Sequence, residues 1–124
     1  MKLIIDMPWG PNLSVNDMRF GRPAPGQKFR RRKPEVQGWM DRLAWEVWIQ
    51  RGGAGAWTEG IMVTVDFRFP DKRRHDTHNY YKVICDAVAG GLGIDDKNIR
   101  PSVGTVDVDR DNAGFTITVE DEAK

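Results

Sequence analysis

The stretch from residue 61 to 69, IMVTVDFRF, constrains the fold more than any other part of the chain. Apolar and polar residues alternate along it, and a period of two is that of a β-strand with one buried face. We therefore predict a half-buried strand here, and the fold must contain a sheet. The apolar positions are Val63, Val65, Phe67 and Phe69, and the polar ones are Thr64, Asp66 and Arg68.

Helical periodicity is found on both sides of this strand. Before it, apolar residues recur every three or four positions from Pro34 to about Arg51, and a proline is tolerated in a first helical turn. After it, the same spacing predicts a second helix that ends near the glycines of AGGLG. The first stripe is Val36, Trp39, Met40, Leu43, Ala44, Val47 and Trp48, and the second is Tyr80, Val83, Ile84, Ala87 and Val88.

The two ends of the chain supply further strands. KLIIDMPW indicates a short first strand, and VGTVDVD and GFTITVE around RDNAG indicate a β-hairpin. The order is strand, helix, strand, helix, strand, strand (β-α-β-α-β-β), which predicts a small α+β domain with one mixed sheet. We expect a single domain over residues 1–124, with a mobile basic loop at about 10–33.

Composition narrows the setting. The chain has 124 residues, of which 40% are apolar and 30% charged, as is usual in a globular domain. The single Cys85 cannot form an internal disulfide, which fits a reducing compartment. The sequence shows neither a signal-peptide pattern nor an apolar run long enough for a membrane span. We expect a cytosolic protein without a membrane partner.

Basic residues gather towards the amino end. Residues 1–34 hold eight Lys or Arg against two Asp, although the formal net charge of the whole chain is +1. Such asymmetry is typical of a surface that faces a polyanion. The alternative interpretation is a solvated basic loop without a binding role.

The segment after the predicted central strand, PDKRRHDTHN at 70–79, combines acids, a basic run and both histidines of the chain. Asp76 and His78 lie two residues apart, Lys82 follows one helical turn later, and Asp95 and Asp96 follow the helix. Carboxylates with an imidazole suit a divalent metal ion such as Mg²⁺ or Mn²⁺. A helix of about twelve residues is roughly 18 Å long, so the spacing alone leaves open whether these groups converge.

The segment PDKRRHDTHNYYKVICDAVAGGLGIDDKNI resembles the core of the RusA family of Holliday junction resolvases, small endodeoxyribonucleases of phages and prophages. The family pattern is a basic stretch, D-x-D-N-x-x-K, a D-A on the helix and a D-D pair before the last strands. The start MPWGPNLSVNDMRF is also similar to the family's amino end. The pattern falls on Asp76, Asn79, Lys82, Asp86 and the pair Asp95 and Asp96.

The resemblance implies roles for these residues. Asp76 and Asp96 are expected to bind the metal, with Asp95 as a further candidate ligand. His78 stands where the family has its second acid, and is expected to be a third ligand or to position water. Lys82 is expected to stabilise charge on the scissile phosphate or to orient the nucleophile. Asn79 and Asp86 remain open between a site role and a local structural one.

The resemblance also implies a function and partners. We expect an enzyme that depends on Mg²⁺, or on Mn²⁺ in preference, and that cuts four-way or other branched DNA as a homodimer in the cytoplasm of a phage-infected or lysogenic bacterial host. Trp45 and Ile49 extend the first helical stripe, and either widen the core face or meet a partner subunit. The expected DNA-binding residues are Lys72, Arg73, Arg74, His75, Lys28, Arg30, Arg31, Arg32 and Lys33.

Three alternatives remain. An imidazole in place of a carboxylate removes a negative charge, so His78 could leave a protein that binds junctions without cutting them. A flap or general nuclease on the same scaffold has the same sequence features. A zinc-stabilised module would need His75, His78 and Cys85 together, and their spacing resembles no closed zinc site.

Overall fold

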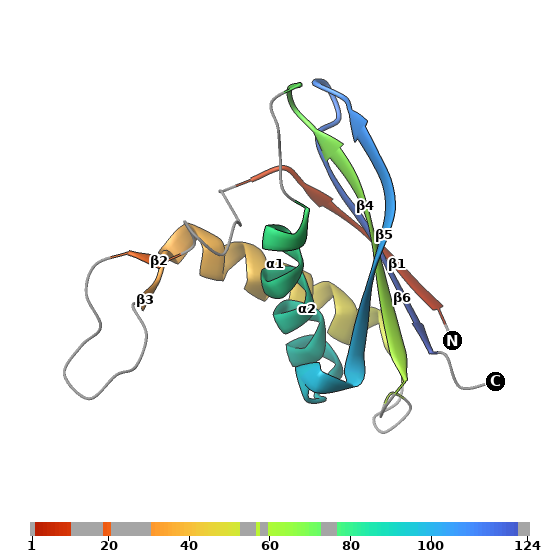
Figure 1. Ribbon diagram of the computed structural model, residues 1–124. Coiled ribbons are helices and arrows are strands. Elements are labelled where there is room, and N and C mark those ends of the chain that lie inside the picture. Colours follow the sequence, from red (N-terminus) through yellow and green to blue (C-terminus); the bar gives the residue numbers. More distant parts are fainter. Residues whose placement is uncertain are drawn as a thin grey trace.

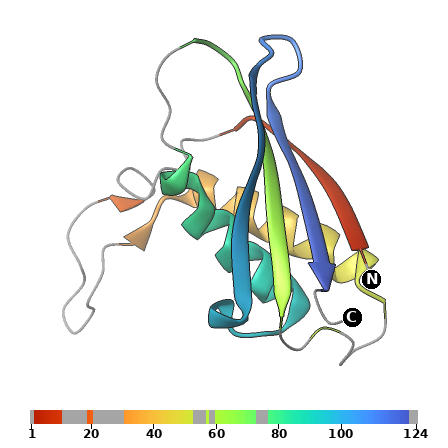
Figure 2. The same cartoon turned by 45° about the vertical axis from the view of Figure 1, so that its right-hand side comes forward.

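The computed structural model describes residues 2–10, 19–20, 31–52, 57, 60–72 and 77–121, with the backbone alone at 19–20, 31–32 and 78–79. A four-stranded mixed sheet carries two helices on one of its faces (Figure 1 and Figure 2). The α+β class and the single mixed sheet predicted from the sequence are confirmed. The elements are β1 (Lys2–Pro8), β2 (Arg19–Phe20), β3 (Arg31–Arg32), α1 (Pro34–Gln50), β4 (Ile61–Phe69), α2 (His78–Leu92), η1 (Asp96–Asn98), β5 (Ile99–Val108) and β6 (Gly114–Asp121).

The strand order in the sheet is β1-β6-β4-β5. β6 is antiparallel to both of its neighbours, and β4 is parallel to β5. The alternation predicted for β4 is observed, since every second residue from Ile61 to Phe69 is buried beneath the helices. The core therefore lies between one face of the sheet and the apolar stripes of α1 and α2.

The helices follow their predicted stripes with one exception. α1 ends within one residue of the predicted end, and its buried side chains are those of the predicted stripe apart from Ala44 and Trp48. Trp48 is 51% exposed, so its assignment to the core is wrong. The Arg51 guanidinium lies 3.7 Å from the centre of its ring, and this cation–π contact covers one side of the indole in place of the core. Trp45 and Ile49 are exposed as well, so they do not widen the core face.

The predicted hairpin of the last two strands is wrong. β5 and β6 lie on opposite sides of β4 and do not pair with each other (Figure 2). The connection crosses the end of β4, where Asp109 N donates to Phe69 O and Arg68 Nε donates to Asn112 O, both at 2.9 Å. Alternating apolar and polar residues indicate a strand, but they do not indicate which strand lies beside it. The strand order follows burial here, because the buried residues of β6 suit a central strand with a neighbour on each side, while β5 is mostly exposed and forms an edge.

The segment predicted as a loop at about 10–33 contains a short antiparallel pair, β2 with β3. Two residues of each strand pair, Arg19 with Arg32 and Phe20 with Arg31. The rest of that segment up to residue 30, apart from Gly10, lies outside the described residues. Among the helices that the structure describes, none is long and apolar enough to cross a membrane.

Candidate active site

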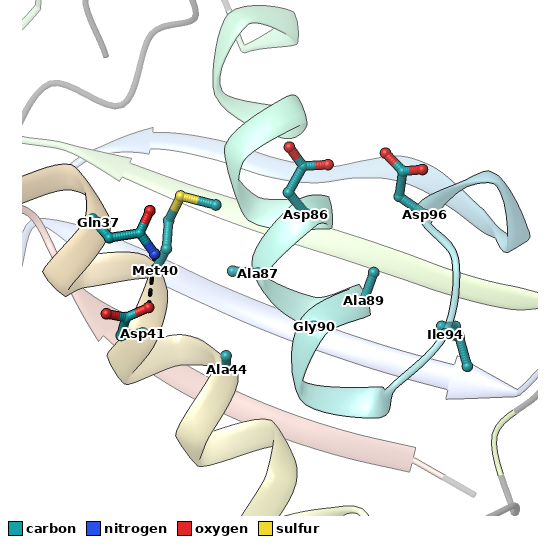
Figure 3. Close-up of a pocket in the computed structure, with 10 residues that line it drawn as sticks. All are labelled: Gln37, Met40, Asp41, Ala44, Asp86, Ala87, Ala89, Gly90, Ile94 and Asp96. Atoms are coloured by element: carbon teal, nitrogen blue, oxygen red, sulfur yellow. Dashed lines mark hydrogen bonds between the residues drawn. The ribbon is translucent and has the colours of Figure 1, made fainter. Parts of the chain in front are cut away.

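Two acids from different elements meet at one lysine of α2. Lys82 Nζ lies 3.2 Å from Asp86 Oδ1 and 3.1 Å from Asp96 Oδ2. Lys82 and Asp86 are one helical turn apart on α2, and Asp96 opens η1 after the helix. Figure 3 shows the carboxyl groups of Asp86 and Asp96 side by side, one from each element. Asp96 therefore does return to the helix, which the sequence left open.

The end of α2 makes this return possible. Gly93 adopts a left-handed conformation with φ of 75°, and its N–H donates to Ala89 O, as does the N–H of Ile94. Glycine takes this conformation without strain, so the chain can leave the helix axis abruptly. Asp95 then accepts a hydrogen bond from Lys97 N at 3.1 Å. Its carboxylate caps η1, and the next residue is directed towards Lys82.

The charges of this cluster do not balance. One ammonium lies between two carboxylates, and hydrogen bonds to Asp96 and Asp86 raise the pKa of Lys82. The hydrogen bond from Lys82 lowers the pKa of the Asp96 carboxyl, whose side chain is 44% exposed. Burial raises the pKa of Asp86, and a hydrogen bond with Asp96 raises it further. Two neighbouring carboxyl groups with opposite pKa shifts are typical of a functional site, although structural ion pairs produce such shifts too.

A pocket opens beside the cluster. It has a volume of about 380 Å³, and Asp86 and Asp96 belong to its lining (Figure 3). α1 contributes Gln37 and Asp41, which are joined by a hydrogen bond of 2.8 Å. A ligand can therefore approach the two acids from the side of α1. The other lining residues are Met40, Ala44, Ala87, Ala89, Gly90 and Ile94.

The thiol next to the cluster is a poor nucleophile. Cys85 is half-buried, and burial raises its pKa to about 12. The thiol therefore stays protonated at neutral pH while no metal is bound, and a protonated thiol is a poor nucleophile.

The structure describes only part of the predicted site. Asp76 and the basic residues Arg73, Arg74 and His75 lie outside the described residues, as do Lys28 and Arg30. His78 and Asn79 are the first two residues of α2, so His78 precedes Lys82 by one helical turn. Lys72 is exposed just after β4, and Lys33 lies at the start of α1. The backbone of Arg31 and Arg32 forms β3.

The donors that the structure does place are suited to a hard divalent cation. Carboxylate oxygens are the preferred ligands of Mg²⁺ and are accepted by Mn²⁺. The side chain of Asp96 is partly exposed, and the carboxyl group of Asp86 lies beside it (Figure 3). Within the described ranges, no three His, Cys, Asp or Glu side chains are grouped to hold a metal. A complete metal site would need donors from the segment at 73–79.

The comparison with protein-family models decides the family. The model described as endodeoxyribonuclease RusA matches residues 21–120. The chain belongs to the RusA family. The resemblance noted in the sequence is thereby confirmed, and the family assigns the chain endonuclease activity on DNA of the Holliday-junction-resolving kind. A search of curated proteins finds no match.

The RusA match includes the whole cluster of Lys82, Asp86 and Asp96. The sequence had singled out Lys82 and Asp96, but it left the role of Asp86 open. The signal that pointed to it is its spacing of four residues from Lys82, which places oppositely charged side chains on one helix face. The same spacing is common on solvated helices, so it does not indicate a site by itself. The contact of Asp96 with Lys82 distinguishes this pair from an ordinary surface ion pair.

Proposed function

We propose that this RusA-family chain resolves four-way DNA junctions by paired, symmetric phosphodiester cleavage that depends on a divalent metal ion. The observation that carries this proposal is the surplus of carboxylate over ammonium at Lys82, Asp86 and Asp96, beside an open pocket. An ion pair that only supports the fold needs no excess of negative charge. A site that binds a metal ion, and through it a phosphate, needs such an excess to attract the ion.

The metal would be held by Asp96 together with Asp76 and His78, with Asp95 as a further candidate. The ion would supply a water of lowered pKa and neutralise charge on the phosphate. The imidazole of His78 in place of a third carboxylate shifts the preference from Mg²⁺ towards Mn²⁺, because nitrogen ligands suit the softer ion better. The preferred ion is therefore part of what must be tested.

Lys82 would stabilise negative charge on the scissile phosphate. In the structure its ammonium is shared between Asp86 and Asp96. If Asp96 held the metal ion, Asp86, whose Oδ1 lies 3.2 Å from Lys82 Nζ in the structure, would remain as the partner that keeps the ammonium at the pocket. Asp86 is thus a positioning residue, and Lys82 contacts the substrate.

DNA would be held through its phosphates. Lys72 follows β4 and is exposed, at the start of the basic run that continues to His75. With the basic residues of 28–33, this run supplies contacts that give affinity but no sequence readout. A homodimer would present two such sites to the two strands of like polarity, in the cytoplasm of the bacterial host.

Cleavage of a labelled synthetic four-way junction tests the function. The junction is compared with a flap and a duplex of the same sequence, in Mg²⁺ and in Mn²⁺, with Asp76→Asn and Asp96→Asn as blanks. We expect paired symmetric nicks on the junction alone, absent in both variants. Preferential cutting of the flap or the duplex would instead assign the flap or general nuclease.

Binding without cutting in either metal would contradict the proposal and point to a junction-binding protein. His78→Asp then identifies the cause, because it restores the family's second acid. Recovery of nicking in that variant would assign the loss to the imidazole. Continued inactivity would assign it elsewhere in the site.

A further inference from the structure

We propose that the pocket between α1 and α2 holds one unpaired base of the DNA next to the scissile phosphate, and that Asp41 selects a base with an exocyclic amino group. This inference rests on the proposed function, since the cluster of Lys82, Asp86 and Asp96 must hold that phosphate. It adds a site for the base and a residue that reads it.

The pocket has two polar walls. Figure 3 shows Gln37 and Asp41 on α1 and, across the pocket, Asp86 on α2 and Asp96 at the start of η1. The second wall is the one at which the metal ion and the phosphate would bind. A nucleotide held there has the pocket open to its base. The carboxylate of Asp41 on the first wall repels a second phosphate, so the base, and not the backbone, suits the interior.

The size and the apolar lining of the pocket suit a single base. Its volume of about 380 Å³ is near the lower end of the roughly 300–1,000 Å³ that ligand sites have, so it admits a base but not a duplex. Apolar residues such as Met40, Ala87 and Ala89 form much of its lining. Proteins that take a base out of its stack hold its faces against apolar or aromatic groups and read its edge by hydrogen bonds.

The pocket continues along the two helices towards exposed indole rings. A second cavity of about 270 Å³ shares Asp41, Ala44 and Gly90 with the first, and Trp45 and Trp48 belong to its lining. These two tryptophans are 60% and 51% exposed. Aromatic side chains along a groove are typical of proteins that bind unpaired DNA, because every base can stack on them. The surroundings of the pocket therefore favour a nucleic-acid ligand.

The hydrogen-bonding groups on the α1 wall select the base. Gln37 Nε2 donates to Asp41 Oδ1 at 2.8 Å and so orients the carboxylate. Within the part of the chain that the structure describes, this is the hydrogen bond that the Asp41 carboxylate forms, so Oδ2 remains to accept one from a ligand. Adenine, cytosine and guanine each have an exocyclic amino group that can donate to it, and thymine has none. We therefore expect thymine to bind least well.

Fluorescence of 2-aminopurine tests the site without cleavage. This analogue of adenine has an exocyclic amino group, and its emission rises when it leaves the stack of bases. It replaces each base at the crossover of a synthetic four-way junction in turn, and each junction is mixed with the full chain in Ca²⁺ or without metal. We expect a severalfold rise in emission at one of these positions when the wild type binds.

Gly90→Leu closes the pocket. A Cβ atom added at Gly90 meets no other atom within 4 Å, and Gly90 lines both cavities, so the leucine would extend into the groove. Leucine also favours a helix more than glycine does. We expect this variant to bind the junction without the rise in emission. The matched control is Gly38→Leu, an exposed glycine of α1 with the same free space outside both linings, which should keep the wild-type signal.

Asp41→Asn tests the selection of the base. Among junctions that differ only in the base beside the cut, the wild type should cleave the one with thymine about tenfold more slowly than the others. The variant should largely remove this difference, because an amide can also donate to a carbonyl of thymine. Thermal unfolding verifies that each variant is folded, and Asp41→Asn tests the pocket independently if Gly90→Leu does not fold.

Several outcomes would overturn the proposal. One is binding of the wild type without a rise in emission at any labelled position, even where the junction is cut. Others are an equal rise in Gly90→Leu and an unchanged preference in Asp41→Asn. A rise in emission without cutting in Mg²⁺ or Mn²⁺ would support the base site while contradicting the proposed nuclease, and failure to bind the junction would overturn both.

Discussion

Two polar clusters on opposite sides of the sheet show what distinguishes a structural ion pair from a site. On the face away from the helices, Arg68 Nη1 donates to Thr116 Oγ1 at 2.6 Å, and Thr116 Oγ1 donates to Asp6 Oδ1 at 2.7 Å. Arg68 Nη2 lies 3.9 Å from Asp6. One cation thus meets one carboxylate through a neutral hydroxyl, and the donors and acceptors match.

The cluster on α2 has no such match. Lys82 serves two carboxylates, and the pKa shifts of Asp86 and Asp96 are opposite in direction. The first arrangement joins three strands of the sheet, whereas the second concentrates negative charge at a pocket. The two clusters therefore differ in the number of carboxylates for each cation, and this difference marks the one on α2 as the candidate site.

The largest expected effect is on catalysis. Asp96→Asn should lower the junction-cleavage rate by roughly 10²–10³-fold, because it removes both a proposed metal ligand and a partner of Lys82. Junction affinity measured in Ca²⁺ or without metal should change little. Asp6→Asn is the matched control, and full activity is expected there. Equal losses in both variants would remove the distinction between the clusters.

The next effect is on stability. Arg68→Ala should lower the free energy of unfolding by about 1–2 kcal/mol, since two hydrogen bonds of the side chain are lost. Cleavage measured well below the melting temperature should be retained. Urea denaturation gives the first quantity. A stable variant without nuclease activity would show that the cluster on the sheet belongs to the function.

A smaller effect, an increase in the free energy of unfolding, is expected at the candidate site. Asp86→Asn should raise the free energy of unfolding by less than about 1 kcal/mol at neutral pH, because burial disfavours the charged carboxylate and solvent screens part of this penalty. The same variant should cleave more slowly, since Lys82 loses its second partner. Asp41→Asn, on the exposed side of α1, is the control for the stability measurement. A loss of stability in Asp86→Asn would mean that this carboxylate mainly supports the fold.

The pH dependence of that gain is the smallest effect. The pKa of Asp86 is raised in the folded protein, so the wild type loses stability as pH rises from the ordinary Asp value of about 3.9 through the folded pKa. The amide that replaces the carboxyl group in Asp86→Asn does not titrate. The advantage of this variant should therefore vanish below this window and be complete above it. Denaturation series at acidic and neutral pH measure this difference, and an advantage that grows towards acid would contradict the assigned shift.

Local patterns predicted the elements well and their neighbours poorly. The alternation in β4 and the stripes of the two helices depend on each residue's own position along the chain, so they could be identified without the fold. The prediction that β5 and β6 pair as a hairpin was wrong, because the alternation of apolar and polar residues in a strand is the same whichever strand lies beside it. The predicted burial of Trp48 was wrong because this residue lies at the margin of the stripe, where Arg51 can cover its exposed ring.

The candidate site divides in the same way. The order of residue types from Asp76 to Asp96 is a property of the sequence, and it was enough to indicate the RusA family. The meeting of Asp96 with Lys82 and Asp86 was decided only by tertiary structure, since it needs the left-handed turn at Gly93 and the parallel return into β5. A chain specifies its local periods through nearby residues, but distances between remote side chains depend on how the helix packs on the sheet.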